Sequence, residues 1–196
     1  MGIWKQILEW DKNFFFAINN GSANSFFDSF LPYSRISNIW IPFYLFLLVF
    51  ITLNYRSRSL PWILLLIFTV ASSDWISSSL IKPNLFRLRP CQDPSFAEQV
   101  RVLVKYCPQS SSFTSSHAVN HFAMAMFIYS TLKDEIGKWL KLIFLWAFVI
   151  IYAQVYVGVH YPLDVICGAI LGMGIGYAWA FSFNRSFSLH HSLRSS

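Results

Sequence analysis

Two residues that could form a nucleophile and its partner lie four positions apart in the C-terminal third of the chain. His160 and Asp164 flank Pro162, which suits the first turn of a helix because the first N–H groups of a helix lack partners anyway. Four residues make about one helical turn, so the Asp164 carboxylate can reach back to the imidazole of His160. A carboxylate on one ring nitrogen fixes the tautomer and makes the other nitrogen a better base or nucleophile. The spacing alone is equally compatible with a histidine at a helix start that has an acid nearby.

Further polar residues stand at the ends of two other apolar segments. They are Lys82, Arg87, Arg89, Ser115, Ser116 and His117. Cations and N–H donors bind phosphate oxygens, and a serine at a helix N-terminus adds free N–H groups and the positive end of the helix dipole. Together with His160, the set indicates phosphoryl transfer, in which His117 protonates the leaving oxygen and then activates water. We expect no metal and no other cofactor, because the cations stabilise the phosphate charge. The alternative is that Lys82 and Arg89 are interfacial anchors and that His117 is a helix-cap residue.

The composition places these residues in a membrane protein. The chain has 196 residues, of which 55% are hydrophobic and 12% are charged, whereas soluble domains carry about 25% charged residues. Aromatic residues make up 19% of the chain, as is typical of proteins with aromatic belts at the membrane interfaces. The net charge of +6 indicates membrane topology and anionic lipid rather than nucleic acid. We therefore expect a lipid substrate, no nucleic-acid partner and no obligate protein partner.

Apolar segments alternate with short polar ones along the chain. We expect about five transmembrane helices, at residues 39–53, 60–81, 115–132, 139–157 and 162–183. Residues 1–19 mix apolar and charged positions and predict an amphipathic helix in the membrane interface. The predicted fold is thus an all-α, polytopic membrane helical bundle with this interfacial helix. It forms one domain over residues 1–183, with an active-site loop at 82–116 and a polar tail at 184–196.

Basic residues predict the orientation of the bundle. With five spans, one face of the membrane receives Arg56, Arg58, Lys133, Lys138, Lys141, Arg185 and Arg194. The positive-inside rule makes this face and the C-terminus cytoplasmic. The long loop and His160 then face the periplasm or the outside of a bacterial inner or plasma membrane. Within the second span, we expect Asp74 to anchor a polar seam between helices rather than to act in catalysis.

Three motifs in this order resemble a known family. They are Lys82-x6-Arg89-Pro90, Ser115-x-His117 and His160-x3-Asp164. The pattern, which covers residues 82–164, resembles the type 2 phosphatidic acid phosphatase superfamily of membrane lipid phosphatases. The resemblance implies a metal-independent phosphoric ester or diphosphate hydrolase that works through a phosphohistidine. It assigns phosphate binding to Lys82, Arg89 and Ser115, acid catalysis to His117, nucleophilic attack to His160 and orientation of the nucleophile to Asp164.

The chain departs from the family pattern in two places. The second motif usually reads Pro-Ser-Gly-His, whereas residues 114–117 are Thr-Ser-Ser-His, so Ser116 takes the glycine position near phosphate. The third motif usually begins Ser-Arg, and here Gln154 stands in place of the arginine. Gln154 keeps an amide donor to phosphate but loses the charge, which could cost roughly 10- to 100-fold in activity. We expect another cation to take over part of this role, the candidates being Arg87, Arg101 and Lys105.

The predicted outer loop also contains two cysteines. Cys91 and Cys107 would lie on the oxidising side of the membrane, which predicts a disulfide that restrains the loop.

The substrate is the least determined feature. Chain length and the amphipathic start look like the small bacterial undecaprenyl pyrophosphate phosphatases of the superfamily, so we expect undecaprenyl diphosphate. Alternatives within the class are phosphatidylglycerophosphate, phosphatidic acid and lipid A 1-phosphate. The alternative outside the class is a non-catalytic membrane protein that binds anionic lipid, with Gln154 marking lost activity.

Overall fold

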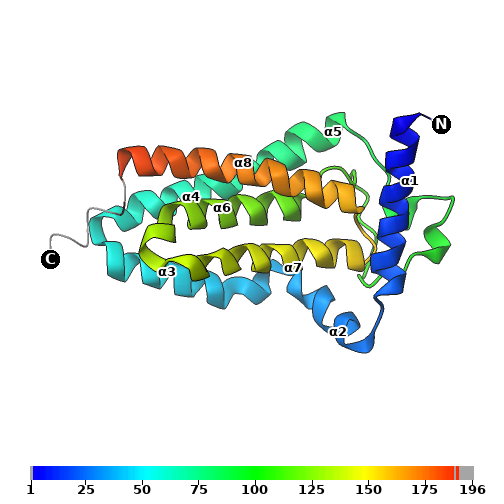
Figure 1. Cartoon of the computed structure of the whole chain (residues 1–196), viewed down its shortest axis with the longest axis horizontal. Coiled ribbons are helices and arrows are strands. Elements are labelled where there is room, and N and C mark those ends of the chain that lie inside the picture. Colours follow the sequence, from blue (N-terminus) through cyan, green and yellow to red (C-terminus); the bar gives the residue numbers. More distant parts are fainter. Residues whose placement is uncertain (1, 188, 190–196) are drawn as a thin grey trace.

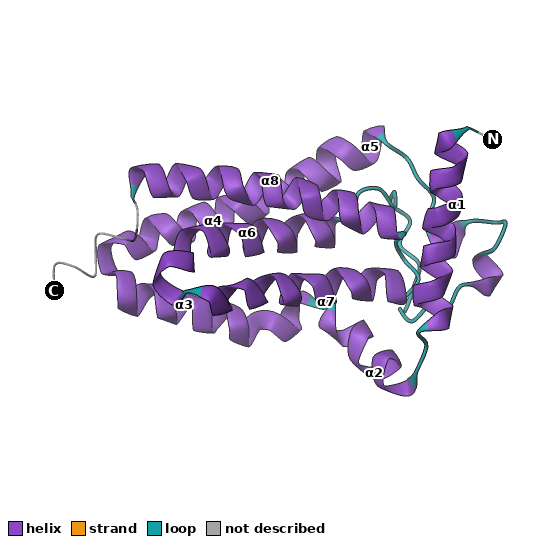
Figure 2. Cartoon of the chain, viewed as in Figure 1, coloured by secondary structure: helices purple, strands orange, loops and turns teal. Residues whose placement is uncertain are grey.

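The computed structural model describes residues 2–187 and 189. All regular structure in this part of the chain is helical, as Figure 2 shows. The main helices are α1 (Ile3–Phe16), α2 (Ser25–Ser34), α3 (Ile41–Tyr55), α4 (Ser59–Trp75), α5 (Lys82–Asn84), α6 (Ser116–Ile136), α7 (Leu142–Tyr156) and α8 (Pro162–Ser186). A wider π-type turn, η4 (Ile76–Ile81), joins α4 to α5. The long helices lie along one axis, and α1 crosses one end of the bundle (Figure 1).

Three segments of the described chain are long and apolar enough to cross a membrane. They are Ser37–Asn84, Lys138–Tyr156 and Pro162–Ser186. The first of these, 48 residues long, contains both α3 and α4, which fold back on each other at Arg56–Arg58. Helix α6 has 21 residues but is less apolar and lies between the others. The protein is therefore an all-helical integral membrane protein, and the long helices occupy the places that the apolar segments predict.

The ends of the elements differ slightly from the prediction. Helix α8 continues three residues beyond the buried Phe183 and ends at Ser186. The first residues of the predicted polar tail at 184–196 thus belong to the last turn of α8, and most of the tail lies outside the described residues.

The closest helix pair is α6 with α8. Glycines recur every four residues on the face of α8 that touches α6, at Gly168, Gly172 and Gly176. A Cβ at Gly172 would lie 2.2 Å from the carbonyl oxygen of Val119, and one at Gly176 equally close to that of Ala123. Small residues let membrane helices approach backbone to backbone. This contact fixes the start of α8, which carries Asp164, beside the start of α6, where the N–H of Ser115 donates to the carbonyl oxygen of Asp164 at 3.3 Å.

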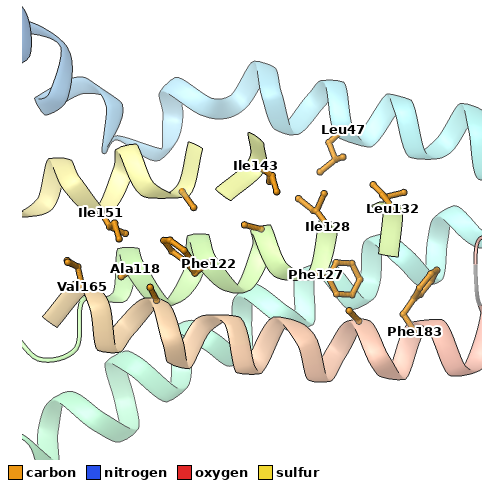
Figure 3. Close-up of a cluster of buried hydrophobic side chains, with 14 of the residues drawn as sticks. Leu47, Ala118, Phe122, Phe127, Ile128, Leu132, Ile143, Ile151, Val165 and Phe183 are labelled. Carbon is orange, nitrogen blue, oxygen red and sulfur yellow. The ribbon is translucent and has the colours of Figure 1, made fainter. Parts of the chain in front are cut away.

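Apolar side chains fill the space between the long helices (Figure 3). Those that the figure labels come from α3, α6, α7 and α8: Leu47, Ala118, Phe122, Phe127, Ile128, Leu132, Ile143, Ile151, Val165 and Phe183. Large apolar side chains also point outward from α3 and α4, among them Phe46, Leu53 and Phe68. An apolar exterior suits lipid, because hydrocarbon solvates these side chains as well as a protein core does.

Helix α1 covers the end of the bundle where the long loop lies (Figure 1). Its outer face exposes Ile3, Trp4 and Trp10, as the amphipathic pattern predicts. Its inner face, however, buries a charged residue: Asp11 is only 4% exposed and lies beside Phe15. The helix therefore contributes a carboxylate to the interior at this end of the bundle.

The basic residues of the predicted cytoplasmic face lie at the opposite end. Arg56 and Arg58 lie in the α3–α4 turn, Lys133, Lys138 and Lys141 lie around the α6–α7 turn, and Arg185 lies in the last turn of α8. Arg194 lies outside the described residues. The grouping of these cations at one end agrees with the predicted topology, and the side of the membrane to which that end belongs stays a prediction.

Candidate active site

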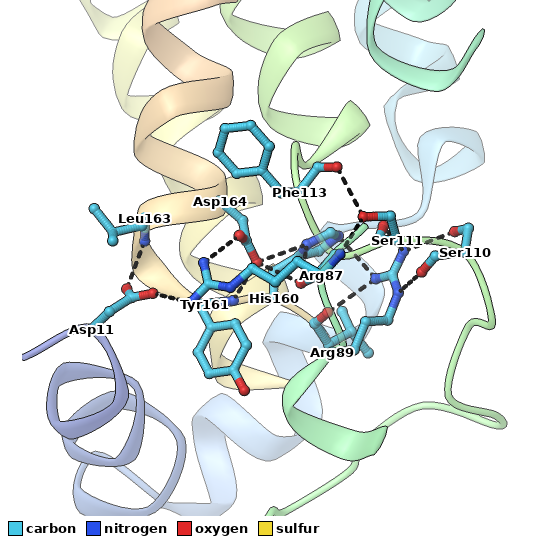
Figure 4. Close-up of polar contacts among 12 residues, drawn as sticks. Asp11, Arg87, Arg89, Ser110, Ser111, Phe113, His160, Tyr161, Leu163 and Asp164 are labelled. Atoms are coloured by element: carbon cyan, nitrogen blue, oxygen red, sulfur yellow. Dashed lines mark hydrogen bonds and ion pairs between the residues drawn. The ribbon is translucent and has the colours of Figure 1, made fainter. Parts of the chain in front are cut away.

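The long loop between α5 and α6 builds one wall of a polar site under α1 (Figure 4). A disulfide joins Cys91 to Cys107, with their Cα atoms 6.1 Å apart, and closes the middle of the loop. The end of the loop returns to its beginning, because the N–H of Ser112 donates to the carbonyl oxygen of Arg87 at 2.8 Å. The loop therefore places Arg87, Arg89 and Ser112 against the start of α8.

His160 is buried at the centre of this site, with 3% of its surface exposed. Its Nε2 lies 3.0 Å from an Nη of Arg89. A guanidinium can only donate, so Nε2 accepts this bond and the ring proton is on Nδ1. The Nδ1 atom lies 3.4 Å from the Ser112 hydroxyl and 3.7 Å from Oδ2 of Asp164. His160 thus presents the Nε2 lone pair, which is the atom that a nucleophilic role requires.

Asp164 is fully buried and accepts hydrogen bonds on both oxygens. Its Oδ2 accepts from the N–H of Tyr161 at 2.9 Å and from the hydroxyl of Ser112 at 2.5 Å. Its Oδ1 accepts from Arg87 at 2.7 Å. Because Ser112 donates to Asp164, its oxygen is free to accept from Nδ1 of His160, and Ser112 thus links the imidazole to the carboxylate. This role of Ser112 could not be predicted from the sequence, because the residue lies outside the three motifs.

Arg87 lies behind Asp164 instead of among the phosphate-binding groups. One Nη bonds Asp164, and the other bonds Oδ2 of Asp11 on α1 at 2.6 Å. The second oxygen of Asp11 accepts the N–H of Leu163 at 2.8 Å. Both ends of the guanidinium are therefore occupied by buried carboxylates (Figure 4). The predicted role of Arg87 in phosphate binding is corrected accordingly: the arginine orients and neutralises Asp164, and Asp11, far away in the sequence, completes the arrangement.

Arg89 occupies the position that the first motif predicts for a phosphate-binding cation. It is 3% exposed and donates to the carbonyl oxygens of Ser110 at 2.9 Å and Val159 at 3.0 Å. Burial lowers the pKa of Arg89 to about 10, with the positive charge of Arg35 acting in the same direction against the attraction of Asp164. Arg89 is therefore charged at neutral pH, and carbonyl groups rather than a carboxylate hold it beside Nε2 of His160.

The N-terminus of α6 provides hydroxyl and N–H groups. Ser115 is the N-cap residue, but its hydroxyl makes no cap bond to the helix. The hydroxyls of Thr114 and Ser115 are buried and have no hydrogen-bond partner among the described residues. Unpaired polar groups are costly in a protein interior. Together with the positive end of a 21-residue helix, these groups form a site suited to an anion.

Ser116 points away from this site. Its hydroxyl lies 2.7 Å from that of Ser77 and 3.1 Å from that of Ser78, both on η4. The predicted phosphate-binding role of the Ser116 side chain is corrected: a first-turn side chain leaves the helix on the side of α4, and only the backbone of Ser116 stays at the N-terminus. The hydroxyl belongs to a polar seam between the two helices.

The same seam contains Asp74. Asn120 of α6 donates to Asp74 at 3.0 Å and accepts from Ser73 of α4 at 2.8 Å. These bonds agree with the expectation that Asp74 anchors helices to each other.

His117 begins the inner face of α6. Its ring stacks on that of His121 with centroids 6.2 Å apart, and it makes no hydrogen bond to the described residues. Its electrostatic neighbours are Arg35, His160 and Lys82. A ring without a partner close to the nucleophile is available to a leaving oxygen or a water molecule, as the predicted role of an acid and base requires.

The site carries excess positive charge. Arg87 is neutralised by Asp11 and Asp164, whereas Lys82, Arg89 and Arg35 have no ion pair within 4 Å among the described residues. Three unpaired cations beside a helix N-terminus favour an anion such as phosphate. No group of three or more His, Cys, Asp or Glu side chains in the described chain could hold a metal ion. The expectation that no metal is needed stays a prediction.

Gln154, at which the third motif departs from the family pattern, contacts an arginine that the motifs do not include. Gln154 on α7 is fully buried, and its Oε1 accepts from Nε of Arg35 at 3.2 Å. Arg35 follows α2, outside all three motifs. None of the cations expected at this place is there. Arg87 bonds Asp11 and Asp164. One Nη of Arg101 donates to both carboxylate oxygens of Asp28, and Lys105 is exposed and makes no hydrogen bond or ion pair to the described residues.

Comparison with known families identifies the arrangement. A family model described as the PAP2 superfamily matches residues 62–188. The chain belongs to the PAP2 superfamily. The family resemblance predicted from the three motifs is thereby confirmed, and the protein is a phosphoric ester hydrolase of the membrane lipid phosphatase class. Arg35 and Asp11 lie outside the matched residues.

Relatives and a solved structure agree with this assignment. A lipid A 4'-phosphatase of Bacteroides thetaiotaomicron is 32% identical over 167 residues, which are 84% of this chain and 72% of that protein. An undecaprenyl-diphosphatase of Sulfolobus acidocaldarius is 31% identical over 142 residues, which are 71% of this chain and 61% of that protein. A transmembrane PAP2-type phosphatidylglycerolphosphate phosphatase from Bacillus subtilis, 19% identical, shares the fold with a TM-score of 0.70 over 93% of this chain and 88% of that one.

The environment of His160 predicts an unusual pH dependence. Burial, reinforced by the charges of Arg89 and Lys82, lowers the pKa of His160 to about 4, although Asp164 acts in the opposite direction. The neutral, nucleophilic ring is present above this pKa and is lost as the pH falls through it. We therefore expect the acidic limb of kcat/KM, which reports the free enzyme, to have its midpoint near this value instead of near about 6.5, the pKa of an ordinary histidine.

The measurement is the rate of phosphate release at limiting substrate in detergent, from neutral to strongly acidic pH, corrected for ionisation of the substrate phosphate. Enzyme returned to neutral pH after each exposure controls for acid inactivation. A reversible midpoint at the ordinary histidine value would contradict a buried, neutral His160.

Proposed function

We propose that this protein hydrolyses a lipid phosphate through a phosphohistidine at Nε2 of His160. The observation that carries the proposal is the arrangement of the His160 ring, with Ser112 and Asp164 on the Nδ1 side and an arginine without a carboxylate partner on Nε2. Phosphate entering the site takes over the donors that Arg89 now directs at Nε2, and the lone pair is released for attack in line with the leaving oxygen.

The reaction then needs two steps. In the first, a bond forms between Nε2 and phosphorus, the ester P–O bond breaks, and the leaving oxygen takes a proton from His117. In the second, His117 removes a proton from water, the water oxygen attacks phosphorus, and the P–N bond breaks to give inorganic phosphate and neutral His160. Lys82, Arg89 and the N-terminus of α6 stabilise the charge on the phosphoryl oxygens in both steps.

A phosphate group of lipid A is the favoured substrate. The support is the 32% identity to a lipid A 4'-phosphatase over 84% of the chain. Undecaprenyl diphosphate, the expectation from chain length, is the second candidate, supported by the shorter match to an undecaprenyl-diphosphatase. Phosphatidylglycerophosphate and phosphatidic acid also fit the class. A non-catalytic lipid-binding role loses its basis, because Gln154 has an arginine beside it.

We also propose that α3, α4 with η4, α6, α7 and α8 all span the membrane, with the site on the periplasmic or outer side and the C-terminus in the cytoplasm. The grouping of the basic residues at the end opposite α1 supports this orientation. Cysteine labelling from each side of the membrane, at Ser57 in the α3–α4 turn and at Ser95 in the long loop, would test it.

The experiment that tests the function is a substrate panel. The full chain, purified in detergent with EDTA present, is given lipid A, undecaprenyl diphosphate, phosphatidylglycerophosphate and phosphatidic acid in matched micelles, and released phosphate is measured. We expect the highest kcat/KM with lipid A, with mass spectrometry showing which of its phosphates is removed. A clear preference for undecaprenyl diphosphate would select the second candidate. Release from none of the four would overturn the proposed function.

A further inference from the structure

Helix α2 delivers a guanidinium to the site from a part of the chain that the family match does not include. Asn24 caps α2 by accepting the N–H of Phe27 at 2.9 Å, and Arg35 follows the last helical residue. Leu31, one turn before Arg35, is 3% exposed and packs in a cluster with Ala153 and Tyr156 of α7. Residues four apart lie on the same face of a helix. The packing of Leu31 therefore directs Arg35 toward Gln154, the residue after Ala153.

The contact between Arg35 and Gln154 fixes the orientation of the amide. A guanidinium only donates, so the atom 3.2 Å from Nε of Arg35 must be the amide oxygen. The amide nitrogen is then left buried without an acceptor among the described residues. An unpaired N–H donor in the interior is costly, and it gains a partner when an anion binds there. Gln154 thus holds Arg35 through one atom and offers a donor through the other.

The charge of Arg35 also has no carboxylate partner within 4 Å among the described residues. Its guanidinium interacts electrostatically with His117 and Arg89, the predicted acid and a predicted phosphate-binding group. Arg89 carries the same charge as Arg35 and His117 can take up the same charge, so holding Arg35 near them costs electrostatic energy. A bound phosphate dianion repays that cost, because it sits among cations that otherwise repel one another.

Arg35 is accessible from outside as well. It lines an open groove of about 420 Å³ on the outer surface of the bundle end, together with Tyr33, Tyr106 and Lys105. One side of the side chain therefore contacts the buried Gln154, while the other faces the groove. A phosphate carried on a large head group can reach the guanidinium along this path.

We propose that Arg35, positioned by Gln154, binds a non-bridging oxygen of the substrate phosphate. The pair supplies together the charge and the N–H donors that one arginine at position 154 would supply alone. This inference rests on the proposed function, since it names a phosphate-binding residue of the same site. It also replaces the earlier expectation that Arg87, Arg101 or Lys105 compensates for Gln154.

The test uses a charge-relocation series in the full-length protein: Arg35→Ala, Gln154→Arg, and the double variant. Arg35→Ala should lower kcat/KM roughly 10- to 100-fold, which corresponds to the loss of one charge-assisted hydrogen bond. In the double variant, the arginine side chain at position 154 can occupy the space that the Arg35 side chain leaves. It should therefore recover most of the kcat/KM that Arg35→Ala loses. Lys105→Ala is the matched control, since it removes one charge from the same groove without a polar contact, and it should retain full activity at moderate salt.

A second readout separates this inference from the function itself. The affinity for inorganic phosphate, measured by its protection of the protein against thermal unfolding, should fall in Arg35→Ala and return in the double variant. The unliganded melting temperature of each variant shows whether it is folded. A merely structural role of Arg35 would lower that temperature and would not be repaired by Gln154→Arg.

Each outcome decides one question. If the wild type hydrolyses lipid phosphates but Arg35→Ala keeps its kcat/KM and its phosphate affinity, the role of Arg35 is overturned and the proposed function stands. If the wild type releases phosphate from no lipid, the proposed function fails. Phosphate protection still tests Arg35 in that case, because unchanged protection in Arg35→Ala overturns the inference. Equal losses in Lys105→Ala and Arg35→Ala would overturn it too, because they would indicate general attraction of anions.

Discussion

Replacing His160 with alanine is expected to abolish phosphate release, with kcat reduced at least about 10⁴-fold, the scale seen when a catalytic nucleophile is removed. The reason is that His160 presents the unprotonated ring nitrogen that lies 3.0 Å from Arg89. The measurement is phosphate release by purified wild type and variant in the same micelles. Acid-labile, base-stable radiolabel should be trapped on the wild type, as expected for a phosphohistidine, and should be missing from the variant.

Two comparisons make the His160 result specific. Added imidazole should restore part of the activity of His160→Ala, because a small ring can occupy the vacated space and attack phosphorus in its place. His121→Gln changes another buried histidine, whose Nδ1 lies 2.8 Å from the carbonyl oxygen of His117, and it should keep most of the wild-type rate. Undiminished radiolabel on the His160→Ala protein would place the nucleophile elsewhere.

Replacing Arg87 with alanine is expected to lower both stability and activity. The change strands two carboxylates, Asp11 at 4% and Asp164 at 0% exposure, that the guanidinium now neutralises. Breaking a buried ion pair by removing one partner costs roughly 3–5 kcal/mol. The unfolding free energy in detergent should fall by that amount, and kcat should fall while the affinity for inorganic phosphate changes little, because Arg87 acts on phosphate only through Asp164 and His160.

A second arginine of the same loop is the control. Arg101 pairs with Asp28, and the two side chains are 28% and 37% exposed. Exposed pairs contribute about 0–1 kcal/mol, so Arg101→Ala should destabilise much less and leave kcat intact. The double variant Arg87→Ala with Asp11→Asn should regain part of the lost stability, because one stranded charge is removed. If Arg87→Ala were as stable and active as Arg101→Ala, the Asp11–Arg87–Asp164 ion pairs would contribute nothing to stability or activity, which would contradict this prediction.

The relation between His160 and Asp164 could be predicted because it is local. Helix geometry alone brings residues four apart together, and Pro162 between them marks the start of a helix. The membrane location could be predicted too, because every segment that crosses a bilayer must be long and apolar enough to span it. In both cases the physical constraint acts within one segment of the chain, so the sequence of that segment shows it directly.

Other features depend on which helices pack together. Asp11 reaches Leu163 across 152 positions, and Arg35 reaches Gln154 across 119. One feature of the sequence could have pointed to Asp11, namely an acidic residue within an otherwise apolar helix face. No comparable feature pointed to Arg35. The direction of the Ser116 side chain could not be predicted for the same reason, since it depends on how α6 packs against α4 and η4.

By itself, then, the sequence determined the helical membrane bundle and the family, and it predicted which residues attack phosphorus and protonate the leaving group. The tertiary structure decided which cations remain free for phosphate. That choice depends on the carboxylates that α1 and α2 bring to the site, with Asp11 engaging Arg87 and Asp28 engaging Arg101. Pairing between charges is a matter of distance in space, and only the packing of α1 and α2 against the bundle sets those distances.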